Sequence, residues 1–335
     1  EWLALCAAFL WAVSSLISVI PAQHLGAFSY SRWRMGCTAV ILSTMAWITG
    51  GWLTVSWEHV TPMMASGLIG IFIGDTALFA CLNRMGPRQA GLLFSCHAVF
   101  SAILGYFLFS EVMTTIELLG ASLVFSGVVM AIFFGRRGQV NNVLEDIKGN
   151  IWVGIGLGLT AAMCQALGGI IAKPVMQTSI DPVAASAIRM ISAFFAHSML
   201  LVLGVKVARS TQHITWRVFG ITALNGFLAM AVGMTLILYA LQEGNVGMVA
   251  LLSSTTPIML LPLLWIYTKR RPNRFAWLGA ALAVIGAGIT GTTTAYNLLK
   301  RGYKVSIFEK HPYAGMETSF ANGGQLSASN AEVWN

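Results

Sequence analysis

Charged residues are scarce in this sequence. Asp, Glu, Lys and Arg together make up 10% of the 335 residues, whereas 56% of the residues are hydrophobic. An ordinary soluble domain carries about 25% charged residues. Too few polar side chains are therefore present to cover a water-exposed fold of this size, and the composition indicates a protein surrounded by lipid.

Paired cysteines and a continuous basic face are also missing. The cysteines lie within or near the end of apolar runs and lack metal-ligand spacing, which favours small buried side chains over disulfides or zinc ligands. The net charge of +8 comes from short clusters of Lys and Arg between apolar runs. Such clusters are typical of membrane-protein loops and speak against nucleic acid as a partner. The five cysteines are Cys6, Cys37, Cys81, Cys96 and Cys164.

Long apolar runs dominate what is present. A bilayer core about 30 Å thick requires roughly 20 residues of apolar helix. Ten runs of about that size predict an all-α membrane protein with ten transmembrane helices, and the Gly and Pro inside several runs are compatible with such helices. The runs lie near 2–20, 29–49, 61–82, 88–109, 117–134, 151–172, 183–204, 216–241, 246–267 and 275–291.

The sequence repeats itself at constant spacing. One set, Ser31, Arg34 and Met35, recurs 155 residues later, with Arg189 as the counterpart of Arg34. A longer second set recurs 159 residues later, which indicates duplication of a five-helix unit. Its matched pairs are Gly74/Gly233, Thr76/Thr235, Leu82/Leu241, Leu92/Leu251, Leu93/Leu252, Ser95/Ser254, Gly120/Gly279, Ala121/Ala280, Leu123/Leu282 and Gly127/Gly286.

An odd number of helices per unit predicts that the second copy is inverted in the membrane. Inverted repeats are a recurrent plan of secondary transporters, because the two halves can exchange conformations and open to alternate sides. The alternative is a duplication in a membrane protein of another kind. We expect a first repeat at 1–134, a linker at 135–150, a second repeat at 151–291 and a tail at 292–335.

Three motifs in order resemble the drug/metabolite transporter superfamily, EamA type, over residues 2 to about 288. They are ACLNRMGPRQAGLL at 80–93, LFSE at 108–111 and LGASLVFSG at 119–127. The resemblance implies a ten-helix carrier of two inverted five-helix halves that moves metabolites such as amino acids or related amphiphiles. One departure is that Ala98 replaces the proline usual in the fourth helix, whereas the ninth helix keeps Pro257.

Two titratable residues lie inside predicted spans, where charge is costly and rarely idle. Asp75, in the third span, has the chemistry to bind a substrate amine or to take up a coupled proton. The alternative is a structural pair with Arg34 or Arg84. His97, in the fourth span, is either a substrate ligand that titrates near neutral pH or a histidine satisfied by a backbone carbonyl. We predict that Asp75 and His97 face a central cavity.

The repeat-related Arg34 and Arg189 sit early in their helices, where a guanidinium can hold a substrate carboxylate in bidentate fashion. The alternative is that both side chains snorkel to lipid phosphate. Three further candidates for cavity walls, or for interface anchors, are Trp11, Asn225 and Tyr239. Glu111 is interpreted as a contact at a helix terminus.

Loop charges give an orientation. The loops after helices one, three, five, seven and nine carry 14 Lys and Arg residues, which places these loops in the cytoplasm and both termini outside. The family resemblance implies instead that both termini are inside. Since the sequence starts at Glu1 and stops at Asn335 within an incomplete domain, we expect both ends to continue in a longer chain.

The last part of the chain carries a dinucleotide-binding pattern. A predicted strand, a glycine turn at Gly286, Gly288 and Gly291, a helix and a second strand lead to Glu309, 21 residues after Gly288. These glycines let backbone approach a pyrophosphate, and Glu309 stands where a ribose-binding acid belongs. Residues 283–291 are also claimed by the tenth helix, which the repeat and the uncharged run from Phe275 to Leu299 favour.

The following segment, YAGMETSFANGGQLS at 313–327, resembles the start of FAD-dependent D-amino-acid dehydrogenases over about 53 residues. A complete enzyme of this type needs a substrate domain and the remainder of its flavin domain. We therefore expect an incomplete βαβ tail without catalysis, and no cofactor unless a longer chain completes the FAD site. No metal site is predicted.

The leading hypothesis is a multi-pass protein of the bacterial inner membrane that transports small metabolites by alternating access, with protons as candidate coupling ions. The second hypothesis is a membrane-fused fragment of a flavin oxidoreductase. A third is a membrane scaffold without transport. The expected partners are the lipid bilayer and a small-molecule substrate.

Overall fold

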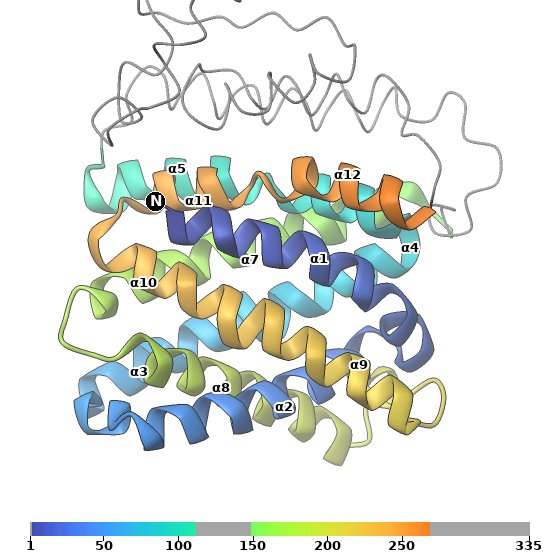
Figure 1. The fold of residues 1–335 in the computed structure, drawn as a ribbon, viewed down its shortest axis with the longest axis horizontal. Helices are drawn as coiled ribbons and strands as arrows, with labels where there is room; N and C mark the ends of the chain where they lie inside the picture. The colour runs from blue at the N-terminus through green and yellow to red at the C-terminus, as the bar shows by residue number, and fades with distance from the viewer. Residues whose placement is uncertain (1, 112–148, 269–335) are drawn as a thin grey trace, which may run out of the picture.

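The computed structural model describes residues 2–111 and 149–268, and the structural statements below concern these residues. The predicted spans 117–134 and 275–291 and the tail lie outside them. The fold is a bundle of long helices packed side by side (Figure 1). The first repeat contributes α1 (Trp2–Leu25), α2 (Ala27–Ile48), η1 (Gly51–Thr54), α3 (Trp57–Ser66), η2 (Gly67–Ile73), α4 (Gly74–Phe94) and α5 (His97–Phe109).

The second repeat follows the same order. It contributes α7 (Ile151–Met176), α8 (Pro182–Val202), η3 (Lys206–Ala208), α9 (Trp216–Gly226), η4 (Phe227–Met234), α10 (Thr235–Glu243), α11 (Val246–Ser253) and α12 (Thr256–Thr268). Within the described residues the predicted apolar runs are mainly helical, but turns at residues 95–96 and 254–255 interrupt the runs 88–109 and 246–267. Five helical segments are long and apolar enough to cross a membrane: Trp2–Leu25, Trp57–Phe109, Ile151–Met176, Pro182–Val202 and Trp216–Glu243.

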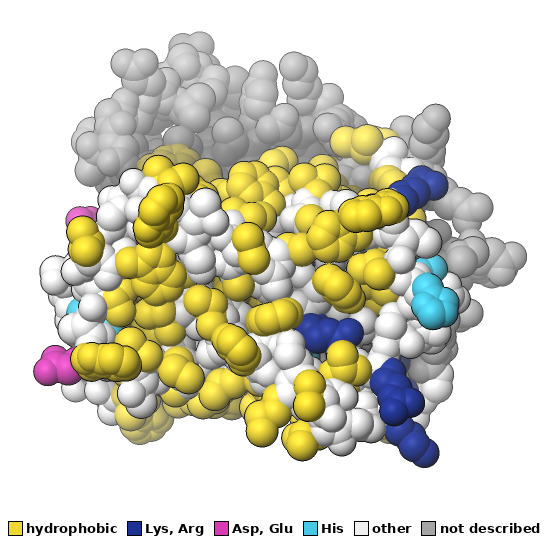
Figure 2. Space-filling model, turned by 90° about the horizontal axis from the view of Figure 1, so that it is seen from below, with side chains coloured by type: hydrophobic (Ala, Val, Ile, Leu, Met, Phe, Trp, Pro, Cys, Tyr) yellow, Lys and Arg dark blue, Asp and Glu magenta, His cyan; other side chains and the backbone are white. Residues whose placement is uncertain are grey.

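Hydrophobic side chains cover most of the face shown in Figure 2, and Lys and Arg gather toward one side of it. Large apolar residues project outward all along the helices, including Trp47 at 78% exposed and Val202 at 85%. Soluble monomers rarely expose such continuous apolar surface, whereas lipid covers it in a membrane. The chain is therefore an integral membrane protein. Cys81, Cys96 and Cys164 are buried as predicted, whereas Cys37 is half-buried and Cys6 is exposed.

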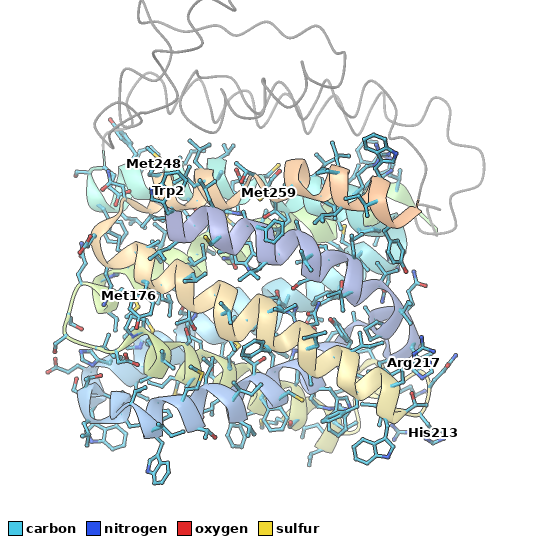
Figure 3. All side chains as sticks on the ribbon, in the orientation of Figure 1. Trp2, Met176, His213, Arg217, Met248 and Met259 are labelled. Carbon is cyan, nitrogen blue, oxygen red and sulfur yellow. The ribbon has the colours of Figure 1, made fainter. Side chains whose placement is uncertain are left out.

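Two ends of the bundle matter for the site, and both can be followed in Figures 1 and 3. The Leu25 end carries the turn between α1 and α2, the bend of α4 at Gly86 and the loop 203–215. The Glu111 end carries the loop 49–56, Glu111, the loop 177–181 and the turn 244–245. At Gly86 the backbone has φ +79°, a conformation open to glycine, and Pro87 supplies no N–H to continue the helix.

The sequence repeat reappears in the helix boundaries. α4 ends at Phe94 and α5 begins at His97, while α11 ends at Ser253 and α12 begins at Thr256, each 159 residues later. Both repeats also contain a π-helical segment at the matching place, η2 and η4. π-Helical segments that interrupt α-helices are frequent at functional sites. The positions that match in the sequence thus also match in helix boundaries and in the π-helical segments.

Packing between the repeats is reciprocal. α2 packs on α8, α1 packs on α9, η4 and α10, and α7 packs on α3, η2 and α4. The closest approaches occur at Gly67 and at Gly226, 159 residues later. A Cβ added at Gly67 would lie 2.5 Å from the carbonyl oxygen of Arg189, and one added at Gly226 would lie 3.1 Å from that of Arg34. Each half thus leaves room for the arginine helix of the other.

Candidate functional site

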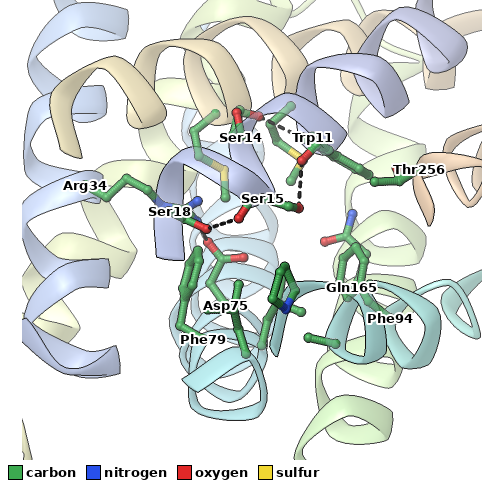
Figure 4. A pocket seen from close by; sticks show the side chains of 18 residues that line it. Trp11, Ser14, Ser15, Ser18, Arg34, Asp75, Phe79, Phe94, Gln165 and Thr256 are labelled. Atoms are coloured by element: carbon green, nitrogen blue, oxygen red, sulfur yellow. Dashed lines mark hydrogen bonds and ion pairs between the residues drawn. The ribbon is translucent and has the colours of Figure 1, made fainter. Parts of the chain in front are cut away.

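A cavity of about 60 Å³ lies between the two repeats (Figure 4). It extends from the middle of the bundle toward the Leu25 end, because its walls come from the second half of α1, from α4 on both sides of the bend at Gly86, and from η4. This volume holds only a few water-sized groups. Its lining comprises Trp11, Ser14, Ser15, Ser18, Arg34, Asp75, Leu78, Phe79, Leu82, Pro87, Ala90, Gly91, Phe94, Gln165, Ala229, Met230, Met234 and Thr256.

A buried ion pair forms the polar floor of this cavity. Arg34 of α2 pairs with Asp75 at the start of α4, and their side chains are 4% and 9% exposed. Arg34 also donates to Asn225 Oδ1 at 3.2 Å. Its guanidinium lies 4.5 Å from the centroid of the Phe79 ring. A cation over an aromatic face is stabilised where water is excluded. The carboxylate of Asp75, the amide of Asn225 and the ring of Phe79 therefore all stabilise the position of Arg34.

Asn225 and Trp11 tie α1 to the second repeat. Asn225 is fully buried and donates to the carbonyl oxygen of Ser14 at 2.7 Å. The indole N–H of Trp11 donates to the carbonyl oxygen of Ala229 at 2.9 Å. The hydroxyls of Ser15 and Ser18 donate to carbonyl oxygens of α1 itself. Their oxygens retain lone pairs, so this wall offers acceptors beside the cation of Arg34.

Asn225 contacts Arg34 but does not line the cavity, and the other predicted site residues lie elsewhere. His97 is 2% exposed at the start of α5 and is not part of the cavity lining, although its ring centroid is 5.1 Å from that of Phe94, which is. Arg189 is 1% exposed, and Tyr239 is 39% exposed; neither lines this cavity. Arg34 and Arg189 are both buried, so snorkelling to lipid phosphate is wrong for this structure. Gly286, Gly288, Gly291 and Glu309 lie outside the described residues.

Glu111 contacts a helix terminus, as predicted, and the helix belongs to the other repeat. Its carboxylate accepts hydrogen bonds from the backbone N–H of Val246, the first residue of α11, at 3.0 and 3.3 Å. It also accepts from Lys173 Nζ at 2.6 Å, and Lys173 donates to the carbonyl oxygen of Gly244 at 2.9 Å. A carboxylate stabilises the positive N-terminus of a helix. We call these contacts the Glu111–Lys173 clasp.

Sequence reasoning missed His197. This side chain of α8 is 1% exposed, with Nε2 3.3 Å from Thr76 Oγ1 and its ring 4.7 Å from the centroid of Phe72. His197 thus adjoins the residue that follows Asp75. Nothing in the local sequence separates it from His97, since both are single histidines in apolar runs. Within the described ranges, no group of three His, Cys, Asp or Glu side chains has the arrangement of a metal site.

Comparison with protein families matches most of the chain to one model. The EamA-like transporter family matches residues 1–133 and 152–292. One solved crystal structure of a protein has a TM-score of 0.66 and covers 90% of this chain and 98% of its own, at 14% sequence identity. At this identity the similarity shows the fold alone.

A second family model, FAD dependent oxidoreductase, matches residues 281–333. D-amino acid dehydrogenase 3 of Mesorhizobium japonicum is 70% identical over 54 residues, which are 16% of this chain and 13% of that protein. D-amino acid dehydrogenase of Dechloromonas aromatica is 55% identical over 51 residues, 15% of this chain and 12% of that protein. The chain thus spans about an eighth of the length of these relatives. The resemblance of both parts of the sequence is confirmed.

Proposed function

Since the chain belongs to the EamA-like transporter family, we propose that it is a carrier of small metabolites that works by alternating access. Membership of this family suggests a membrane transporter of small molecules, and the proposal adds mechanism and substrate. The observation that carries it is the cavity between the repeats, with the Arg34–Asp75 pair at its floor. Bacterial relatives of the tail support a location in a bacterial inner membrane.

The architecture we propose is two inverted five-helix halves, at 1–134 and 151–291, joined by the linker 135–150 and followed by the tail 292–335. The matched helix boundaries and the reciprocal packing support it. If the halves exchange conformations, the cavity opens to one membrane face and then to the other. Ten spans follow from this arrangement.

The substrate we propose is amino-acid-like or a related amphiphile. A carboxylate on the substrate fits the guanidinium of Arg34, which forms paired hydrogen bonds with such groups. An ammonium group fits Asp75 and the serine oxygens of α1. The carboxylate of the substrate then takes the place of Asp75 beside Arg34, and its ammonium group takes the place of Arg34 beside Asp75. Alternatively, Asp75 takes up a proton when Arg34 turns to the substrate, which couples transport to protons.

A resistance screen tests this function. Bacterial cells that express the chain are exposed to a panel of toxic amino acids and amine-containing amphiphiles, beside cells that express Asp75→Asn at equal membrane abundance. We expect the chain to change growth on some compounds and Asp75→Asn to abolish the change. Asp181→Asn is the matched control, because Asn also caps helix α8. The proposal fails if no compound separates expressing from empty cells, or if Asp75→Asn behaves as the chain itself.

A second candidate function rests on the 70% identity of the tail to a D-amino acid dehydrogenase. In this alternative the chain is a membrane-fused fragment of an FAD-dependent oxidoreductase. The absorbance spectrum of the purified protein separates the two: the carrier carries no flavin, whereas near one flavin per chain favours the oxidoreductase.

A further inference from the structure

One polar side chain of the cavity wall has unused hydrogen-bonding groups. Gln165 of α7 is half-buried and lines the cavity, and its amide makes no hydrogen bond among the described residues. A glutamine amide offers two N–H donors and a carbonyl acceptor. Most of the lining is apolar, so these groups are costly there unless water or a ligand satisfies them. The packing of the helices alone therefore gives no reason for a glutamine at this position.

The neighbouring polar groups differ from Gln165 because their donors are already used. The Trp11 indole N–H donates to a carbonyl oxygen of η4, and the hydroxyls of Ser15 and Thr256 donate to carbonyl oxygens about one helical turn earlier. Ser14 Oγ also lacks a partner, but this atom is buried. Among the neutral side chains that line the cavity in the described part of the chain, Gln165 is thus the one with free N–H donors.

Gln165 lies across the cavity from the ion pair. In Figure 4 the Arg34–Asp75 pair lies at one side of the space, and the Gln165 amide points into it from the other side, toward the wall of α1. The rings of Trp11 and Phe94 also line this second side, with centroids 6.2 Å apart. A ligand whose charged head binds Arg34 and Asp75 therefore extends its other end toward Gln165.

The proposed substrate has such a head. Its carboxylate and ammonium groups fit Arg34 and Asp75, so the side chain of the amino acid is the part that meets Gln165. This side chain must be short, because a cavity of about 60 Å³ holds only a few water-sized groups.

The amide of Gln165 also sets the chemistry at the end of that side chain. A carboxamide has a donor and an acceptor at the same spacing as those of Gln165, so the two amides can form two parallel hydrogen bonds. A carboxylate has no donor for the carbonyl oxygen of Gln165. An alkyl group has neither donor nor acceptor, and it would displace water and leave the amide unsatisfied. Such losses discriminate strongly between ligands of the same shape.

We propose that Gln165 is a specificity-determining residue that binds the terminal carboxamide of a small amino acid, while the Arg34–Asp75 pair binds its charged groups. Asparagine represents this class. Leucine has the same branching and nearly the same size without polar atoms on its side chain, and aspartate has a carboxylate in place of the amide. The inference rests on the proposed transport function.

Binding is measured by isothermal titration calorimetry on the full chain in mixed micelles, so the readout does not depend on transport. We expect the Kd of asparagine to be lower than that of leucine by about tenfold or more, because two hydrogen bonds are lost with leucine. Aspartate should also bind more weakly than asparagine, since it cannot donate to Gln165.

Two variants assign the preference to one side chain. Gln165→Met keeps the length of the side chain and removes its hydrogen-bonding groups. It should raise the Kd of asparagine about tenfold and leave that of leucine unchanged or lower, which also shows that the variant folds. Gln177→Met is the matched control, because Gln177 is exposed at the C-terminal cap of the same helix, and it should change neither Kd.

Equal Kd values for asparagine and leucine, or a Gln165→Met chain that prefers asparagine as strongly as before, overturn the role of Gln165. Tighter binding of aspartate than of asparagine overturns the assignment of a carboxamide. In each of these cases amino acids still bind, so the proposed function stands. If none of the three amino acids binds, the proposed substrate class fails and the inference fails with it.

Discussion

The Arg34–Asp75 pair gives the sharpest test of how the cavity floor is built. The perturbation is Asp75→Asn, which keeps the size of the side chain and removes its charge. Both side chains are less than a tenth exposed, so the guanidinium of Arg34 is left without a counter-charge in a place that water barely reaches. Removing one partner of a buried pair costs about 3–5 kcal/mol.

The structure places the expected loss at the lower end, about 3 kcal/mol, because some support for Arg34 survives. Asn225 Oδ1 still accepts from it, and the Phe79 ring still lies beneath it. Arg34→Gln alone strands the carboxylate of Asp75 and should cost a similar amount. The double variant removes both charges of the pair, so its loss should fall short of the sum of the single losses by about 2 kcal/mol.

The assay is an unfolding titration in mixed micelles, followed by tryptophan fluorescence, on the chain, the two single variants and the double variant. Asp181→Asn is the matched control. Asp181 is the N-cap of α8 and Asn is an equally good N-cap, so the free energy of unfolding should change by no more than about 0.5 kcal/mol. Additive single effects, or an Asp75→Asn no less stable than Asp181→Asn, would refute the claim that the pair is buried and coupled.

Three further outcomes follow from the packing and from the tail. Gly67→Ala should lose about 1–3 kcal/mol of stability in the same titration, because its Cβ would meet backbone of α8, whereas Gly220→Ala, with nothing within 4 Å, should be neutral or slightly stabilising. Asn225→Leu should lose about 1–3 kcal/mol, since the carbonyl of Ser14 and Arg34 both lose a partner, and a loss below 0.5 kcal/mol would contradict this. Deleting residues 295–335 should leave resistance unchanged at equal membrane abundance, and a loss would show that the tail takes part.

The helices could be predicted from the sequence because apolar length alone decides them. α1 and α7 coincide with predicted spans, although each helix continues several residues further, to Leu25 and to Met176. Hydropathy indicates only the apolar part of a helix. A polar last turn, such as that of α1, is still helical because its backbone hydrogen bonds continue those of the helix. The bend at Gly86 adjoins a proline that breaks the helix ladder, and this also follows from local sequence.

The site could be predicted only in part. A structural pair of Asp75 with Arg34 or Arg84 was the alternative to a functional carboxylate, and the structure shows the pair with Arg34. His97 was expected in the cavity and lies outside it, while its repeat counterpart Thr256 lines the wall. A repeat in the sequence indicates which positions correspond, but it does not indicate which of two corresponding positions faces the cavity. That choice belongs to tertiary packing.

Lys173 shows a second limit. Its position near the end of an apolar run indicates a cation at a helix end, yet its partner Glu111 lies 62 residues earlier in the other repeat. Local pattern predicts that a carboxylate near a helix end finds a backbone N–H, and Glu111 does so at α11. It does not predict that the helix belongs to the other half.

The differences between the repeats bear more on the mechanism than their similarities. Two identical halves would give two conformations of equal energy in a symmetric membrane, and neither would dominate. Here Met234 occupies the position that corresponds to Asp75, so among the described residues Asp75 is the one acid beside both arginines, paired with Arg34 and interacting electrostatically with Arg189. Closing the cavity further dehydrates the Arg34–Asp75 pair, which is costly, and the corresponding positions of the second half hold no such pair. This difference makes the two conformations unequal in energy and favours the one in which the Arg34–Asp75 pair keeps its cavity.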